Sequence, residues 1–162
     1  MRHPLRRKTR QSDSERRGAA LAEMAVCMPV FVLLVFAMIE FGHVYMTINV
    51  LNAAAAQSAR IGITEKSTTS EVITRAQEIV GAAMDSSAVT IMVKDGSSFD
   101  DDPNIDTDAI DYAGLPDIDL ESAEPRDLFI VRIEVPYDQV GILGPTWLNG
   151  VNLAGQAVMR HE

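Results

Sequence analysis

A single glutamate stands inside the most apolar stretch of the chain, just after a junction of two small residues. Between Ala19 and Gln57 only Glu23 and Glu40 carry charge. An ionised carboxylate inside hydrocarbon costs about 2.5–3.5 kcal/mol, so Glu23 needs the membrane interface or a cationic partner. The small Gly18–Ala19 pair would let the backbone enter a peptidase active site at the membrane face. Cleavage there would create an α-amino group roughly four residues from Glu23, with which the carboxylate could pair.

A second group of oxygen-bearing side chains has the spacing of a calcium-binding loop. Positions 1, 3, 5, 7, 9 and 12 of such a loop would be filled by Asp100, Asp102, Asn104, Asp106, Asp108 and Asp111. However, Ile105 stands where these loops require glycine, and the last ligand is Asp rather than Glu. Residues 95–127 hold twelve Asp or Glu, so such spacing arises easily by chance. We favour a solvated acidic loop over a metal site and keep calcium as the alternative.

The residue types needed for catalysis are sparse. The sequence contains no serine nucleophile motif and no glycine loop that would cradle phosphate. Its three histidines, His3, His43 and His161, are far apart in the chain. We therefore expect a protein that is not an enzyme and that carries no cofactor.

A long helix that crosses a membrane is expected to position Gly18, Ala19 and Glu23. The uncharged block Met24–Ile39 corresponds to about 24 Å of helix, and Ala19–Tyr45 to about 40 Å, against a hydrocarbon core of about 30 Å. The helix is expected to cover residues 19–61, because no Gly or Pro occurs from Val44 to Ile61. Small residues in its projecting half predict close packing against another helix: Ala53, Ala54, Ala55, Ala56 and Ala59.

Charge is distributed very unevenly along the chain. Residues 1–18 contain seven of the 14 Lys and Arg and two of the 23 Asp and Glu, so this leader carries +5 and the rest −14. Basic residues on one side of a membrane span favour the cytoplasm, which places the acidic body outside it. An acidic body would repel phosphate, so nucleic acid is not an expected partner. We expect a disordered leader over residues 1–15.

The remaining residues, 62–162, predict a small α+β head. Thr68 and Glu71 have the spacing of a capping box that opens an amphipathic helix with an apolar stripe as far as Met84. Alternating apolar residues predict three antiparallel strands over residues 88–94, 128–135 and 153–160. The sheet is expected to pack on this helix and on the projecting part of the first one. The acidic loop 95–127 joins the first two strands.

The N-terminal residues resemble the type IV prepilin processing signal, which has a basic leader, a glycine and a glutamate at the fifth mature position. Gly18 and Glu23 stand at these positions. The residue after the signal glutamate is commonly aromatic, whereas here it is Met24. Further segments are similar to the TadE-like family: Glu23–Val26, Pro29, Ile39–Gly42, Asn52–Arg60 and the tail from Val135 to Arg160. The resemblance is dense over residues 16–62, recognisable over 128–162 and absent between.

This resemblance implies a minor pseudopilin of the tight-adherence (Flp) pilus, with a pilin-like head, that helps to initiate or regulate fibre assembly. It implies processing by a prepilin peptidase between Gly18 and Ala19 and a role for Glu23 in assembly. The implied location is the bacterial inner membrane, with a cytoplasmic N-terminus and a periplasmic head, and incorporation in an extracellular pilus is compatible with it. The implied partners are other pilins and pseudopilins and the inner-membrane assembly platform.

One alternative from another class of protein stays open. An uncleaved signal anchor could hold a periplasmic sensor or binding module, with calcium as a candidate ligand. The mass of the membrane-bound protein separates the two hypotheses, because processing removes eighteen residues and anchoring removes none.

Overall fold

The computed structural model describes residues 9–101, 110–142 and 150–162, with side chains from residue 16 onward except that of Asp101. Its contacts divide the chain into two units, Met1–Phe41 and Gly42–Glu162. We call residues 16–41 the anchor segment and residues 42–162 the head. Each is described separately below.

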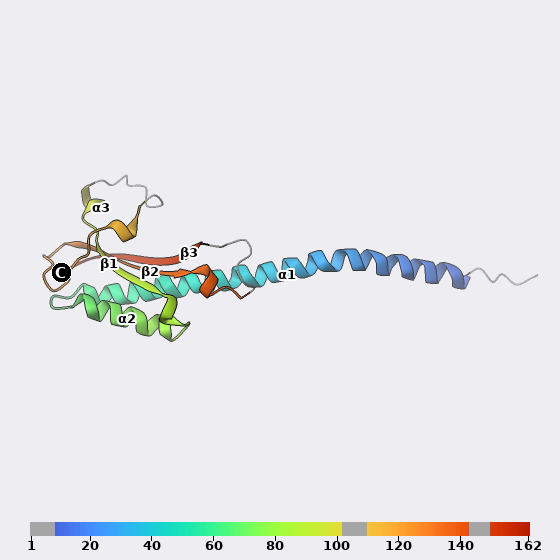
Figure 1. The fold of residues 1–162 in the computed structure, drawn as a ribbon, viewed down its shortest axis with the longest axis horizontal. Helices are drawn as coiled ribbons and strands as arrows, with labels where there is room; N and C mark the ends of the chain where they lie inside the picture. The colour runs from blue at the N-terminus through green and yellow to red at the C-terminus, as the bar shows by residue number, and fades with distance from the viewer. Residues whose placement is uncertain (1–8, 102–109, 143–149) are drawn as a thin grey trace, which may run out of the picture. The chain divides into compact units, whose positions relative to one another are not determined.

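Helix α1 spans Thr9–Gly62 and supplies all of the anchor segment and the first element of the head (Figure 1). The predicted helix ended at residue 61, close to the observed end, but it began at Ala19. The prediction that residues 1–15 are disordered is therefore wrong from Thr9 onward. The segment between Pro4 and Gly18 has no helix breaker and contains Arg, Gln and Glu, which favour helix. The head also begins earlier than residue 62, because α1 residues from Gly42 onward belong to it.

Helix α2 spans Thr69–Gly81 and begins with the predicted capping box. The Thr68 hydroxyl accepts from the Glu71 backbone N–H at 3.1 Å, and the Glu71 carboxylate accepts from the Thr68 N–H at 3.0 Å. Two backbone donors at the start of the helix thereby gain side-chain acceptors. The apolar stripe faces the core through Val72, Ala76 and Val80. The helix ends three residues before Met84, where the predicted stripe ended.

Three antiparallel strands form one sheet in the order β1–β2–β3, as predicted. Strand β1 spans Thr90–Asp95, β2 spans Leu128–Pro136 and β3 spans Asn152–Arg160. Alternate side chains of β2 point to the same face and are fully buried: Phe129, Val131, Ile133 and Val135. In the neighbouring strands Ile133 is paired with Ile91 and Gly155. The period of two in the sequence thus defines the inner face of the sheet.

Helices α1 and α2 lie side by side on this inner face (Figure 1). Leu51 of α1 and Val72 of α2 share one core with Val131 of the sheet. Gly155 marks the closest approach, because a Cβ there would collide with the α1 backbone at Leu51 and Asn52. Glycine therefore lets β3 lie directly against the helix.

The acidic segment between β1 and β2 contacts the outer face of the sheet through Asp100, Tyr112 and Asp117. Further along the segment, Leu120 belongs to the core on the inner face. The described part of the segment includes α3 (Ser98–Asp101) and the short 3-10 helix η2 (Tyr112–Gly114). Tyr112 is 8% exposed and Leu120 1% exposed, so both are buried. The expectation of a solvated loop over residues 95–127 therefore does not hold for residues 112 and 120. Tyr112 and Leu120 lie in a strongly polar segment and belong to no repeating apolar pattern of a helix or strand, so the sequence did not indicate that they are buried.

Candidate functional site

The predicted processing junction lies within the N-terminal part of α1. Gly18 and Ala19 are both exposed, and a Cβ at Gly18 would have nothing within 4 Å. Packing in the described structure therefore gives no reason for glycine at this position. Glycine also weakens a helix by about 1 kcal/mol relative to alanine, which makes local unwinding of the chain easier at this position. The junction combines accessibility with a weak point in the helix.

Glu23 is exposed on the same helix, four residues after Ala19. Residues at i and i+4 lie one above the other, with Cβ atoms about 5–6 Å apart. Cleavage after Gly18 would turn the Ala19 nitrogen into an ammonium group at a new helix N-terminus. A carboxylate near that end is favoured both by the new charge and by the helix dipole. The geometry permits a pair with the amine of the same chain or of a neighbouring copy.

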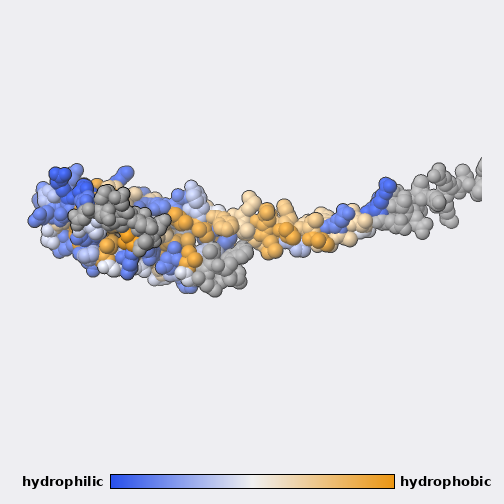
Figure 2. Space-filling model, turned by 90° about the horizontal axis from the view of Figure 1, so that it is seen from above, coloured by the Kyte–Doolittle hydropathy of each residue, from blue (hydrophilic) through white to orange (hydrophobic). Residues whose placement is uncertain are grey.

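The anchor segment exposes apolar side chains on all sides. Between Leu21 and Phe41, fourteen large hydrophobic residues are exposed, from 36% at Val35 to 74% at Val26. On the face seen in Figure 2, hydrophobic residues follow one another along this stretch. Among the described residues, one helix is long and apolar enough to cross a membrane, over Arg16–Gly62. A helix that is apolar all round requires lipid or other protein around it. This is consistent with a single-pass membrane protein.

The five alanines predicted to pack against another helix fall into two groups. Ala54, Ala55 and Ala59 are fully buried in the core of the head, beside α2 and the sheet. Ala53 is exposed and Ala56 is half-buried. The buried alanines thus pack within the head itself, while close packing of Ala53 and Ala56 against another helix remains a prediction.

Most of the candidate calcium ligands lie outside the described residues, namely Asp102, Asn104, Asp106 and Asp108. The other two make contacts with protein groups. Asp100 accepts two hydrogen bonds from Arg160, at 2.6 and 3.0 Å, and Asp111 accepts from the Ala113 N–H at 3.2 Å. Within the described part of the chain, no group of three or more His, Cys, Asp or Glu could hold a metal ion.

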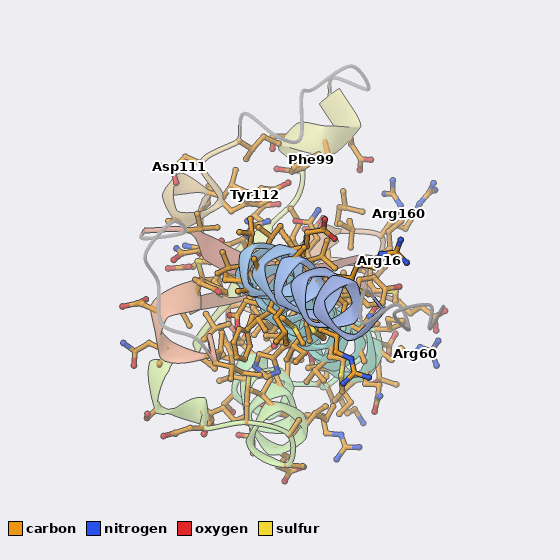
Figure 3. All side chains as sticks on the ribbon, turned by 90° about the vertical axis from the view of Figure 1, so that its right-hand side faces the viewer. Arg16, Arg60, Phe99, Asp111, Tyr112 and Arg160 are labelled. Atoms are coloured by element: carbon orange, nitrogen blue, oxygen red, sulfur yellow. The ribbon has the colours of Figure 1, made fainter. Side chains whose placement is uncertain are left out.

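Sequence reasoning missed three cations on the outer face of the sheet, one on each strand, which we call the cation row: Lys94, Arg132 and Arg160. Lys94 Nζ lies 2.7 Å from Asp117 Oδ1. The Arg132 guanidinium stacks on the ring of Tyr112 at 4.0 Å. Each cation therefore contacts the acidic segment, whose residues Asp111 and Tyr112 are labelled in Figure 3 together with Arg160. The alternation of β2 puts Arg132 on this face, but no local pattern indicates its aromatic partner.

The third contact of the cation row is a two-pronged ion pair. The hydrogen bonds and charge of Asp100 raise the pKa of the Arg160 guanidinium above its usual value. Both side chains are about half exposed, and exposed pairs contribute little stability. Arg160 NH1 also donates to the Arg126 carbonyl at 3.1 Å. This contact therefore fixes the position of the segment more than it stabilises the head.

Comparison with known proteins gives one match. Residues 18–60 match the family model of the TadE-like proteins, which confirms the resemblance stated from the sequence for these residues and leaves that of the tail untested. The match begins at Gly18, includes Glu23 and ends near the end of α1, so α2 and the sheet lie outside it. No curated protein and no solved structure matches the chain.

Proposed function

We propose that this protein is a minor pseudopilin of a tight-adherence (Flp) pilus system. The match of residues 18–60 to the TadE-like family suggests involvement in such pilus systems. In this proposal a prepilin peptidase cleaves between Gly18 and Ala19, and the processed chain helps to initiate or regulate fibre assembly. Its partners are other pilins and pseudopilins and the assembly platform of the inner membrane.

The observation that carries the proposal is the position of the family match on the structure. It covers the exposed Gly18–Ala19 junction, the exposed carboxylate of Glu23 and the apolar anchor segment. A helix with this exposure suits transfer from lipid to a bundle of similar helices, since both surround it with apolar groups. Glu23 then meets a cation during transfer instead of remaining alone in hydrocarbon.

The proposed topology places the N-terminus in the cytoplasm and the head in the periplasm. Exposed Arg16 and Arg17 lie immediately before the apolar stretch, where positive charge favours the cytoplasmic side. The protein acts as a structural assembly component and not as an enzyme. The alternative function, an uncleaved anchored binding module, shares this topology but predicts no processing.

The mass of the membrane-bound protein tests the proposal. In cells that contain the peptidase, the wild-type chain is expected to lose residues 1–18 and to begin at Ala19. Gly18→Leu is expected to block this loss, because the larger side chain crowds the peptidase site. Mass spectrometry of the purified protein measures both.

Gly42→Leu is the matched control, since Gly42 also lies in α1 with nothing within 4 Å of an added Cβ. This variant is expected to be processed like the wild type. A wild-type protein that retains Met1 in peptidase-positive cells contradicts the proposal and favours the uncleaved anchor.

A further inference from the structure

The acidic segment of the head leaves the sheet at one point and is held firmly again at another. It leaves after Gly96, whose N–H still donates to the Leu128 carbonyl at 2.8 Å. It is held again at Tyr112, whose side chain is buried against the sheet. We call residues 97–101, which follow the point of departure, the acidic arm.

The hydrogen bonds of the acidic arm are mostly local. The Ser97 N–H donates to Asp95 Oδ1 at 2.8 Å. The N–H groups of Phe99 and Asp100 donate to carbonyls three residues earlier, both at 2.9 Å. Phe99 is half-buried but lies outside the hydrophobic core of the head. Among the described residues, the arm is joined to the rest of the head by the hydrogen bonds of Asp100 with Arg160, at 2.6 and 3.0 Å.

The three contacts of the cation row differ in their exposure to solvent. The side chains of Arg160 and Asp100 are 50% and 46% exposed. In contrast, the Lys94 side chain is 11% exposed, and Tyr112, on which Arg132 stacks, is 8% exposed. The Debye length falls from about 10 Å at 0.1 M salt to about 3 Å at 1 M, and buried pairs are screened much less than exposed ones. Salt therefore weakens the Arg160 contact first.

We infer that the ion pair of Asp100 and Arg160 is a salt-sensitive latch that holds the acidic arm on the end of β3. The two bonds between guanidinium and carboxylate give the closed arm one defined position. They hold it only weakly, because exposed ion pairs contribute little stability. When the latch opens, the arm detaches and the Arg160 guanidinium becomes free of Asp100. The part of the segment from Tyr112 onward stays in place, because its contacts are buried.

This device belongs to the head alone and does not depend on the proposed function. It differs from the contacts of Lys94 and Arg132, which salt is expected to leave intact. The arm and the part held by Tyr112 should therefore respond differently to salt, although both belong to the same acidic segment. That difference is the observable consequence of the latch.

Distances between spin labels on the full chain in detergent test the latch. In a Cys27→Ala background, cysteines that carry nitroxide labels replace Ser98 of the arm and Gln77 of α2, both of which are exposed. Double electron–electron resonance then compares about 0.05 M with about 1 M NaCl, where the Debye length is short. We expect a narrow distance distribution at low salt and a clearly broader one at high salt. Arg160→Gln is expected to be broad under both conditions.

The control pair is Ala113 with Gln77, because Ala113 is exposed but directly follows the buried Tyr112. Its distribution is expected to stay narrow at both salt concentrations. The control variant is Arg126→Gln, which removes the charge of an exposed arginine and keeps the backbone carbonyl that Arg160 contacts. With the labels at Ser98 and Gln77, this variant is expected to behave like the wild type.

Three results would overturn the latch. A narrow Ser98–Gln77 distribution in Arg160→Gln, or in the wild type at high salt, would show that other contacts hold the arm. A broad distribution in the wild type at low salt would show that the ion pair does not close it. Equal broadening of the Ala113–Gln77 pair at high salt would show that the whole segment moves. Asp100→Asn breaks the pair from the other side and keeps the test decisive if Arg160→Gln disturbs folding.

Discussion

At the scale of single residues, Glu23 is the side chain whose chemistry fits assembly best. Replacement by Ala or Gln removes the charge and makes the helix more apolar, so membrane insertion is expected to persist. Pilus assembly is expected to fall strongly, because the amine that the proposed cleavage creates at Ala19 would have no carboxylate to pair with. Electron microscopy of pili together with membrane fractionation measures both effects.

Glu65→Ala serves as the control for Glu23, since Glu65 is an exposed glutamate of the head outside the family match. This variant is expected to assemble normally. Normal piliation with Glu23→Ala would contradict the pairing role, and loss of membrane insertion would contradict the physical reason given for it.

Gly155 is a residue whose importance only the structure shows. Gly155→Ala would push a methyl group into the α1 backbone at Leu51 and Asn52. Overpacking of this kind costs about 1–3 kcal/mol, so the variant is expected to unfold at a clearly lower temperature. Thermal unfolding of the full chain in detergent, followed by circular dichroism, measures the change.

Gly81→Ala is the control for Gly155, because an added Cβ there meets only the Ser86 hydroxyl at 3.7 Å. Alanine favours the helical end where Gly81 stands, so stability is expected to be unchanged or slightly higher. Equal melting temperatures for Gly155→Ala and the wild type would show that α1 and β3 are not in close contact.

At the scale of elements, α2 and the three strands could be predicted because each depends on residues that are close together in the sequence. The capping box of α2 requires only two residues three apart, and the inner face of β2 follows from alternation over eight positions. The contacts of Tyr112 and Leu120 join positions far apart in the chain, and no periodic pattern of apolar residues predicts them. The early start of α1 at Thr9 has a different reason, since a polar composition does not by itself prevent helix formation.

The capping box allows a direct test at this scale. Thr68→Ala removes the side-chain acceptor of the Glu71 N–H and should destabilise the head by roughly 1 kcal/mol. Thr74→Ala is the matched control, because the Thr74 hydroxyl bonds only within α2, to the Ser70 carbonyl at 2.8 Å, and alanine favours the helix interior. Chemical unfolding of both variants measures the difference. Equal loss in both would show that the cap has no special role.

At the scale of the whole molecule, the sequence indicated where the long apolar stretch and the acidic charge lie but not how the acidic segment is held. The charge asymmetry and the apolar run are properties of composition and therefore visible without a structure. The cation row is a property of the fold, since Lys94, Arg132 and Arg160 come from three different strands.

The last prediction concerns the response of the acidic head to divalent cations. Binding of calcium to the folded state alone would stabilise it by about 2.7 kcal/mol at a hundredfold excess over Kd. Asp100 already pairs with Arg160 at 2.6 Å, and Ile105 lacks the freedom of glycine at the sharp turn of a calcium loop. We therefore expect calcium and magnesium to shift the melting temperature alike and only slightly, by screening the mutual repulsion of carboxylates.

Melting curves of the full chain in detergent, with chelator, calcium or magnesium, provide the measurement. Asp100→Ala with Asp111→Ala removes the first and last candidate ligands, and Glu65→Ala with Glu78→Ala removes the same charge from exposed positions elsewhere in the head. If the cations act only by screening, the shift in melting temperature is expected to be reduced equally in the two double variants, because each variant lacks two negative charges and screening depends on total charge. A rise in melting temperature that is specific to calcium and lost only with Asp100 and Asp111 would instead establish a calcium site in this segment.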